Sequence, residues 1–268
     1  FIYTIGKVYD DEMTFTSSNS ELMKLDKPKN YNSGIFICKY DSIGNVLKTK
    51  YISEEKNESV NDAFIDNKEN IYVGGDYEFR TYDNRSLVKN SYLVMKLNSD
   101  FELIWKQKGD TIGISSINSI YLDNKSNIIA TGGFDKNIKF GKIEFSSSKK
   151  DPIADIGSSF VAKFNNRGEL EWATDSLGKF RGGNGNGRGV VCDKQGNSYI
   201  YVSTPYSNKF FTKIDKSGKI QWINTIKGNF SDCNRKMIID DNDNIYLCGE
   251  GSGTVFLCNK RKYRFLSR

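Results

Sequence analysis

One short pattern returns along this chain and limits its fold more than any other feature. The pattern begins with Asp, places Asn four positions later and continues as a short apolar strand. Its full copies are Asp66–Gly75, Asp123–Gly132, Asp193–Val202 and Asp240–Gly249. A fifth copy, Phe1–Gly6, lacks the Asp-to-Asn half. Repeats of this kind indicate an array of one supersecondary unit that must stack on its neighbours to bury a core.

The Asp-to-Asn half predicts a tight turn between two antiparallel strands. Aspartate accepts hydrogen bonds from amides of its own turn, and asparagine tolerates the left-handed conformation. A second hairpin follows in each unit, and its turns are Asp41–Asn45, Asn98–Glu102, Asn165–Glu169 and Asp215–Lys219. Gly44, Gly168 and Gly218 are expected to supply the positive φ of these turns. Each unit is therefore predicted to contain four short antiparallel strands, which we name A to D.

Strand D carries one large aromatic residue at an equivalent position in three units. These residues are Trp105, Trp172 and Trp222, and Lys48 takes the position in the first unit. An exposed ring could stack on a sugar, but a repeated tryptophan is more typical of packing between units. We predict the packing role.

The spacing of the turn aspartates predicts the architecture. They are 57, 70 and 47 residues apart (66 to 123, 123 to 193 and 193 to 240), and four short strands in such a period are typical of propeller blades. We predict an all-β chain with one domain over 1–268, a β-propeller of about five four-stranded antiparallel blades whose first blade lacks its innermost strand. The blades are expected at about 1–52, 58–107, 116–174, 187–224 and 234–268. Because Phe1 falls inside a strand pattern, we expect the domain to be part of a longer protein.

Two stretches carry a resemblance to a known family. Gly132–Gly141 together with Ser159–Trp172 resembles the SBBP family of bacterial β-propeller repeats, and Asp215–Trp222 is also similar to quinoprotein-like propeller repeats. The resemblance extends loosely over the whole chain. It implies a propeller in exported, cell-surface or envelope-associated bacterial proteins, and it implies no particular chemistry.

Composition excludes several classes of function. No apolar run is long enough to cross a bilayer. The net charge is +6, but basic and acidic residues are interspersed, whereas nucleic-acid binding needs a basic stripe. The absence of histidine excludes histidine-dependent catalytic triads.

No metal or cofactor is expected. The five cysteines form no C-x-x-C pair, so a zinc site is not predicted. Asp240–Asn244 is rich in acids, but Ile245 occupies the place of the glycine that a calcium loop requires. Cys248 and Cys258 flank a tight link, and two interpretations stay open: a disulfide, or two small buried hydrophobes.

The variable links are the expected binding surface. Antiparallel order sends the A–B and C–D turns to one end of the blades, the turn end, and the B–C and D–A links to the other, the link end. Long links at 7–34, 76–91 and 133–158 could bind a ligand or merely cover blade edges. The glycine-rich stretch 182–189 fits no phosphate-loop pattern and is predicted to be a flexible loop. Arg181, Asn184 and Arg188 around it are the candidate residues for an acidic or glycan ligand.

These features favour a non-enzymatic binding or scaffold module of an exported bacterial protein, with a protein or a surface glycan as its partner. A first alternative is a carbohydrate-active hydrolase with two carboxylates at the mouth of the channel. Asp76, Glu78, Asp135 and Glu144 are available for that role, but no pair can be assigned. A second alternative is a purely structural propeller segment of a large adhesin or surface filament.

Overall fold

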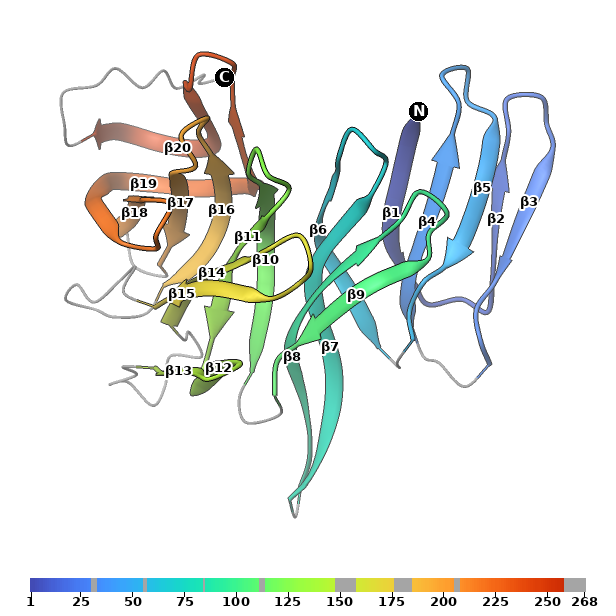
Figure 1. Cartoon of the computed structure of the whole chain (residues 1–268), viewed down its shortest axis with the longest axis horizontal. Helices are drawn as coiled ribbons and strands as arrows, with labels where there is room; N and C mark the ends of the chain where they lie inside the picture. Colours follow the sequence, from blue (N-terminus) through green and yellow to red (C-terminus); the bar gives the residue numbers. More distant parts are fainter. Residues whose placement is uncertain are drawn as a thin grey trace. The chain divides into compact units, whose positions relative to one another are not determined.

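The chain is all-β, as predicted. The computed structural model describes residues 1–29, 33–54, 57–83, 85–110, 114–147, 158–175, 185–204 and 208–257, with the side chains of 79–83, 85–89, 208, 227–236 and 248–257 left out. Every element in these ranges is a strand, and all pairings are antiparallel (Figure 1). In this part of the chain no helix is long and apolar enough to span a membrane.

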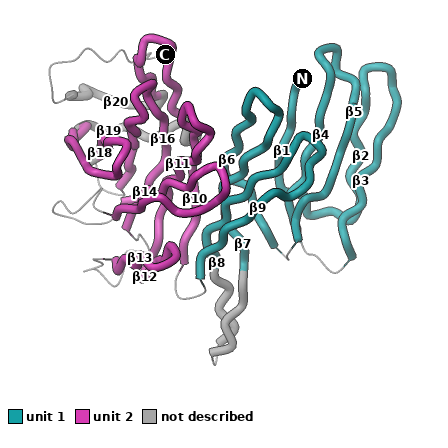
Figure 2. Tube along the Cα trace, viewed as in Figure 1, with its two compact units in different colours: residues 1–111 teal, residues 112–268 magenta. Residues whose placement is uncertain are grey.

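The chain divides into two compact units, 1–111 and 112–268 (Figure 2). The first unit contains β1 (Ile2–Val8), β2 (Glu12–Thr16), β3 (Leu22–Asp26), β4 (Gly34–Tyr40), β5 (Val46–Tyr51), β6 (Glu58–Ile65), β7 (Ile71–Asp83), β8 (Arg85–Leu97) and β9 (Leu103–Lys108). The second contains β10 (Ser115–Leu122), β11 (Ile128–Phe134), β12 (Asn137–Phe140), β13 (Ile143–Ser146), β14 (Ser158–Phe164), β15 (Leu170–Thr174), β16 (Asn186–Cys192), β17 (Ser198–Ser203), β18 (Asn208–Ile214), β19 (Ile220–Ile239) and β20 (Ile245–Leu257).

Four sheets follow the predicted strand order. The first sheet is β1-β4-β5, the second β6-β7-β8-β9, the third β10-β11-β14-β15 and the fourth β16-β17-β18-β19-β20. Neighbours in each sheet are therefore the strands A to D in chain order. The first sheet has no strand in the A position among the described residues, which agrees with the shortened first copy of the repeat.

The C-terminal part differs from the prediction. A separate fifth blade was expected over 234–268, but β19 runs without a break from Ile220 to Ile239 and pairs with β20 in the fourth sheet. Register shifts between Lys227 and Asn229 and between Asp232 and Met237 absorb the irregular stretch within the strand. The polar residues between the two predicted blades, 225–233, were expected to form a link. In the structure their backbone is extended, and they are part of β19.

The three long B–C links form hairpins. The link 7–34 contains the β2–β3 hairpin, the link 133–158 contains β12–β13, and the link 76–91 is the extension of β7 and β8. One link lengthens its own sheet and the other two form small separate sheets, while their role in binding stays a prediction.

Each large sheet of the first unit buries apolar side chains. Ile35 and Ile37 on one face of the first sheet pack with Ile71, Val73 and other residues of the second sheet. The opposite face, with Phe36 and Cys38, packs against Phe15 and Leu25 of the β2–β3 hairpin. Burial on both faces explains why β4 is almost continuously apolar.

The second unit has the same construction. Ile129 and Val161 of the third sheet share a core with Val190, Ile200 and Val202 of the fourth. The β12–β13 hairpin is anchored by Phe140, whose ring centroid lies 5.1 Å from that of Phe160. Two adjacent sheets in each unit are therefore held face to face by apolar side chains.

Candidate functional site

The repeated aspartates are turn residues. Asp66 Oδ1 accepts from the backbone nitrogens of Lys68 and Asn70, each at 2.9 Å, and Oδ2 accepts from Asn70 Nδ2 at 2.9 Å and Tyr72 Oη at 3.0 Å. Asp193 and Asp240 make the same set of bonds. The side-chain and backbone hydrogen bonds of Asn244 lower the pKa of Asp240 to about 2. The predicted turn chemistry is confirmed, and the pKa of Asp66, like that of Asp240, is lowered, because hydrogen bonds within the turn outweigh the effect of burial.

A left-handed residue closes every one of these turns. Among the described residues, the fourth turn residue has positive φ in eight A–B and C–D turns: Gly44, Glu69, Phe101, Ser126, Gly168, Gly196, Gly218 and Asp243. The predicted role of Gly44, Gly168 and Gly218 is confirmed. In the other turns the closing hydrogen bonds of the hairpin hold non-glycine residues in this region, as in the bond from Glu69 N to Asp66 O at 2.9 Å.

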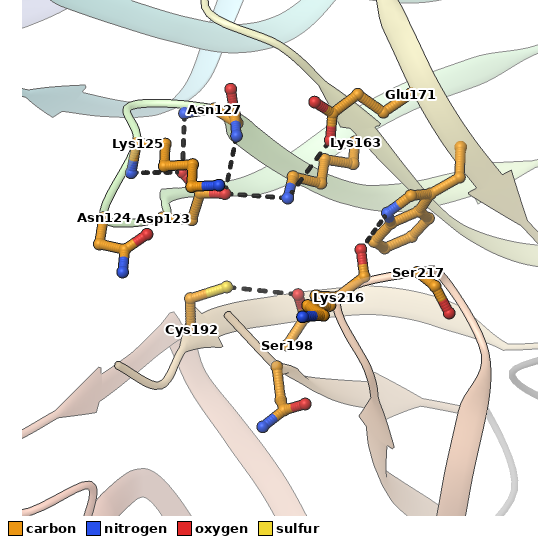
Figure 3. Close-up of polar contacts among 12 residues, drawn as sticks. Asp123, Asn124, Lys125, Asn127, Lys163, Glu171, Cys192, Ser198, Lys216 and Ser217 are labelled. Atoms are coloured by element: carbon orange, nitrogen blue, oxygen red, sulfur yellow. Dashed lines mark hydrogen bonds and ion pairs between the residues drawn. The ribbon is translucent and has the colours of Figure 1, made fainter. Parts of the chain in front are cut away.

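One turn replaces the tyrosine with a lysine (Figure 3). Ile129 stands where the other full copies have tyrosine, and Lys163 Nζ lies 2.9 Å from Asp123 Oδ2 and 3.3 Å from Glu171 Oε2. The side chains of Asp123 and Lys163 are buried, whereas that of Glu171 is partly exposed. This cluster brings a buried ammonium group and two carboxylates together at the turn end of the second unit, and it is therefore examined as a candidate for acid–base chemistry.

Electrostatics assign the cluster a structural role. Burial would raise the pKa of Asp123, but hydrogen bonds from Lys163 and Asn127 outweigh it and lower the pKa. Burial would lower the pKa of Lys163, but the bond to Asp123 and the nearby charges raise it. Both groups are therefore held in their charged forms at neutral pH, so neither is tuned to exchange a proton.

The neighbouring thiol is equally inert. Cys192 is buried, and its Sγ lies 3.3 Å from Ser198 Oγ (Figure 3). Burial raises the pKa of Cys192 to about 11, so the thiolate needed of a nucleophile or metal ligand is scarce at neutral pH. Cys38 is also free and buried. The question of a Cys248–Cys258 disulfide lies outside the described residues.

Trp172 packs between two sheets. Its Nε1 donates to the carbonyl oxygen of Lys216 at 3.1 Å, and a Cβ added to Gly218 would lie 2.8 Å from the indole ring. Trp222 packs on Phe211, with ring centroids 5.7 Å apart. The predicted packing between units is confirmed for Trp172, whereas the ring contact of Trp222 is with a residue of its own sheet. The equivalence of the D-strand positions is also confirmed, because each faces a lysine of strand C: Lys39–Lys48, Lys96–Trp105, Lys163–Trp172 and Lys213–Trp222.

At the link end, the candidate ligand residues are only partly described. Arg181 and Asn184 lie outside the described residues. Arg188 lies in β16 and is half-buried, at a register shift between Gly187 and Gly189. The stretch 182–189 is therefore not a loop throughout, because its last residues belong to a paired strand.

An amide contact that sequence reasoning missed lies beside Arg188. Asn118 Nδ2 donates to Asn186 Oδ1 at 2.5 Å and to Gly187 O at 2.9 Å. Asn118 is buried and occupies the register shift of β10 between Ile117 and Ser119. Asn61, Asn118 and Arg188 all precede their turn aspartate by five residues, and this common spacing is the signal that could have identified them as bulge residues.

The carboxylates considered for hydrolysis are held by neutral donors. Asp76 is buried and accepts from Asn61 Nδ2 at 3.1 Å and Asn90 Nδ2 at 3.0 Å. Glu78 accepts from Asn57 Nδ2 at 3.1 Å.

The other two considered carboxylates lie in the second unit. Asp135 accepts from Ile114 N at 2.6 Å, and Glu144 is exposed on β13. Within the described ranges no group of three or more acids and cysteines is arranged to hold a metal ion.

Comparisons with known proteins give little information about function. No protein-family model and no curated protein matches the chain. A crystal structure of a protein of unknown function from Bacteroides caccae is similar, with 11% sequence identity and a TM-score of 0.30, over 82% of this chain and 92% of that one. The resemblance to SBBP repeats therefore stays a prediction.

Proposed function

We propose that this chain is a β-propeller that acts as a non-catalytic binding or scaffold module of an exported bacterial surface protein. The observation that carries the proposal is the contrast between the two ends of the sheets. At the turn end, the carboxylates of the repeated aspartates accept hydrogen bonds from the backbone of their own turns. At the link end, the B–C links are built into hairpins. Structured links on a regular scaffold are the usual place for recognition.

The partner is proposed to be a protein or a surface glycan that contacts Arg181, Asn184 and Arg188. Arginine suits acidic partners because its planar guanidinium can form paired hydrogen bonds with a carboxylate. The position of Arg188 in a paired strand gives it a fixed backbone, which lowers the entropy lost on binding.

A glycan array, extended with acidic peptides, tests this function. Arg181→Ala and Arg188→Ala should each weaken a detected interaction about tenfold, the effect of losing roughly 1.4 kcal/mol. Arg167→Ala is the matched control, because Arg167 is exposed at the turn end and pairs only locally with Glu169 at 3.2 Å. Equal weakening by all three variants would contradict a link-end site. A ligand that none of the three weakens would contradict it too.

A second candidate function is a carbohydrate-active hydrolase. Asp76 and Glu78 are two positions apart on β7, so their side chains leave the same face of the second sheet. Glycoside hydrolysis needs two carboxyl groups roughly 5 to 10 Å apart. Release of reducing ends from a polysaccharide, abolished by both Asp76→Asn and Glu78→Gln, would replace the binding proposal with this one. Asp135→Asn, in the other unit, is the control.

A further inference from the structure

The third sheet departs from the repeat at two positions, and both lie beside the same lysine. Ile129 is opposite Lys163 in the register and stands where the other full copies have a tyrosine. Glu171 stands directly before the equivalent D-strand residue, and its Oε2 lies 3.3 Å from Lys163 Nζ. The residues at this second position in the other sheets carry no charge: Leu47, Ile104 and Gln221. The two departures occur where one buried lysine has two carboxylates beside it.

The lysine of the third sheet contacts its turn aspartate more closely than its counterpart in the fourth sheet does. In the fourth sheet Tyr199 Oη donates to Asp193 Oδ2 at 3.1 Å. Lys213 Nζ there lies 5.1 Å from the ring centroid of Tyr199 and 3.9 Å from Asp193 Oδ2. In the third sheet, which lacks the tyrosine, Lys163 Nζ lies 2.9 Å from Asp123 Oδ2 (Figure 3). Both side chains are buried, with 8% and 3% of their surface exposed.

The carboxyl group of Asp123 is held in a way that suits the addition of a nucleophile to its carbon, Cγ. Its Oδ1 accepts hydrogen bonds from the backbone nitrogens of Lys125 at 2.8 Å and Asn127 at 2.9 Å. Two backbone N–H groups on one oxygen stabilise the negative charge that develops there when a carbonyl carbon is attacked. Its Oδ2 lies beside Lys163 and accepts from Asn127 Nδ2 at 2.9 Å. The turn therefore holds the oxygen that would stay, and the lysine lies beside the oxygen that would leave.

We infer that Lys163 Nζ and Asp123 Cγ form an amide bond, an internal covalent cross-link of the third sheet, with Glu171 as the proton carrier of the reaction. The ammonium group first gives one proton to Asp123 Oδ2, which leaves a neutral amine and a neutral carboxyl group. The amine attacks Cγ, the C–N bond forms and the negative charge develops on Oδ1. Glu171 takes a second proton from Nζ and passes it to Oδ2. The Cγ–Oδ2 bond then breaks, one water molecule leaves, and Glu171 is a carboxylate again.

The reaction has to occur only once in each molecule. Asp123 and Lys163 are held in their charged forms, which suits them poorly for repeated proton exchange, but a cross-link requires a single passage. Fixed contact between the reacting groups removes the entropy cost of bringing them together, and burial keeps water away from the product. Until the bond forms, the groups are the ion pair described above, and the effects of that pair on stability are those of the molecule without the cross-link. The inference does not depend on the proposed function, because the bond forms within the chain and needs no partner.

Intact-mass spectrometry of the purified chain, with a reductant to keep its five cysteines reduced, is the experiment. The mass should be lower than that of the sequence by one water molecule. Trypsin should fail to cleave after Lys163, because the amide removes the positive charge of the side chain. The digest should contain one branched peptide that joins the segments of Asp123 and Lys163. This measurement is made on the unchanged protein, so it does not depend on the folding of any variant.

Three variants assign the chemistry. Lys163→Arg removes the attacking amine but keeps the positive charge, and it should restore the full mass. Glu171→Gln keeps the size of the side chain but loses the proton acceptor, so the bond should form about 10²-fold more slowly and freshly purified protein should have mostly the full mass. A merely structural role of Glu171 would leave the mass at the lower value. Lys213→Arg, at the equivalent position of the fourth sheet, is the matched control and should still lack one water molecule.

Two results would overturn the inference. The first is the full mass in the unchanged protein together with normal cleavage after Lys163. The second is a loss of water that persists in Lys163→Arg, which would place the dehydration elsewhere, as in a cyclic imide formed by an aspartate with the next backbone nitrogen. A cross-link that forms equally fast in Glu171→Gln would overturn the part assigned to Glu171.

Discussion

The two units join their sheets at equivalent places with different chemistry. In the first unit, ion pairs connect the first sheet to turns of the second: Lys39 Nζ lies 2.7 Å from Glu69 Oε2, and Lys48 Nζ lies 2.8 Å from Asp100 Oδ1. In the second unit, Trp172 reaches a turn of the fourth sheet and donates to the carbonyl oxygen of Lys216. Lys48 and Trp172 occupy the same D-strand position, and each contacts the C–D turn of the next sheet.

The comparison shows that the repeat determines which positions of neighbouring sheets are in contact. It does not determine whether the contact is an ion pair or apolar packing. Geometry brings the D strand of one sheet to the C–D turn of the next. At this position Lys48 forms a partly exposed ion pair with Asp100. Trp172 instead packs its ring on the turn and donates one hydrogen bond to the carbonyl oxygen of Lys216. Exposed ion pairs contribute little and are screened by salt, whereas a half-buried ring contributes through the area that it removes from water. The second unit should therefore depend more on this position than the first.

The largest effect is expected for Trp172→Ala. Truncation of a large aromatic residue in a core costs roughly 3–5 kcal/mol, and the half-buried setting of this ring reduces the expectation to about 2–4 kcal/mol. Chemical denaturation followed by circular dichroism measures the loss. Lys48→Ala is the matched control at the equivalent position. Equal losses in the two variants would break the comparison.

A slightly smaller loss is expected for Asp123→Ala. The variant leaves the buried ammonium of Lys163 with Glu171 at 3.3 Å as its remaining counter-charge. Breaking a buried pair typically costs about 3–5 kcal/mol, and the remaining carboxylate should limit the loss to about 2–3 kcal/mol. Asp240→Ala removes the same turn bonds at an exposed site without such a lysine, and should cost clearly less.

The ion pair of Asp123 and Lys163 should make the stability of the protein depend on pH. The lowered pKa of Asp123 contributes stability that is present above its unfolded pKa of about 3.9 and is lost as pH falls through the folded pKa. The raised pKa of Lys163 contributes stability that is present below about 10.4 and is lost as pH rises through the folded pKa. The stability difference between wild type and Asp123→Asn should be flat from pH 5 to 9 and shrink on both sides. A steep change near neutral pH would contradict it.

The smallest structural effect is expected for Lys48→Ala. Its partner Asp100 is largely exposed, so the melting temperature should change by only about 1–2 °C, and added salt should remove the difference. Salt should leave the effect of Trp172→Ala unchanged. Thermal melts of both variants at low and high salt check this, and a salt-independent loss for Lys48→Ala would contradict the electrostatic account.

Much of the local structure was predictable from the sequence. The turns followed from Asp66, Asn70 and their repeats, because each carboxylate accepts hydrogen bonds from amides within its own turn and these bonds need no distant residue. The sheet order followed from the alternation of apolar strands and turns. The D-strand positions of Trp105 and Trp172 followed from their distance to the turns.

Other features depend on distant contacts and could not be predicted. The bond from Asn118 to Asn186 joins residues that are 68 positions apart, and no local pattern signals it. The continuation of β19 into the region expected to form a fifth blade depends on pairing with β20. Lys163 Nζ lies 2.9 Å from Asp123 Oδ2, whereas Lys213 Nζ lies 3.9 Å from Asp193 Oδ2 in a turn that keeps its tyrosine. The loss of the tyrosine at Ile129 is visible in the sequence, but the shorter ion pair that accompanies it is not.

The β2–β3 hairpin has a consequence for how the first sheet can grow. It packs Phe15 against Phe36, with ring centroids 5.5 Å apart, on the face turned away from the second sheet. The first sheet therefore has one face on the second sheet and apolar side chains of its other face under the hairpin. A further sheet that approached from that side would therefore meet the hairpin, and its contacts would be set by the variable B–C link and not by the repeated strands.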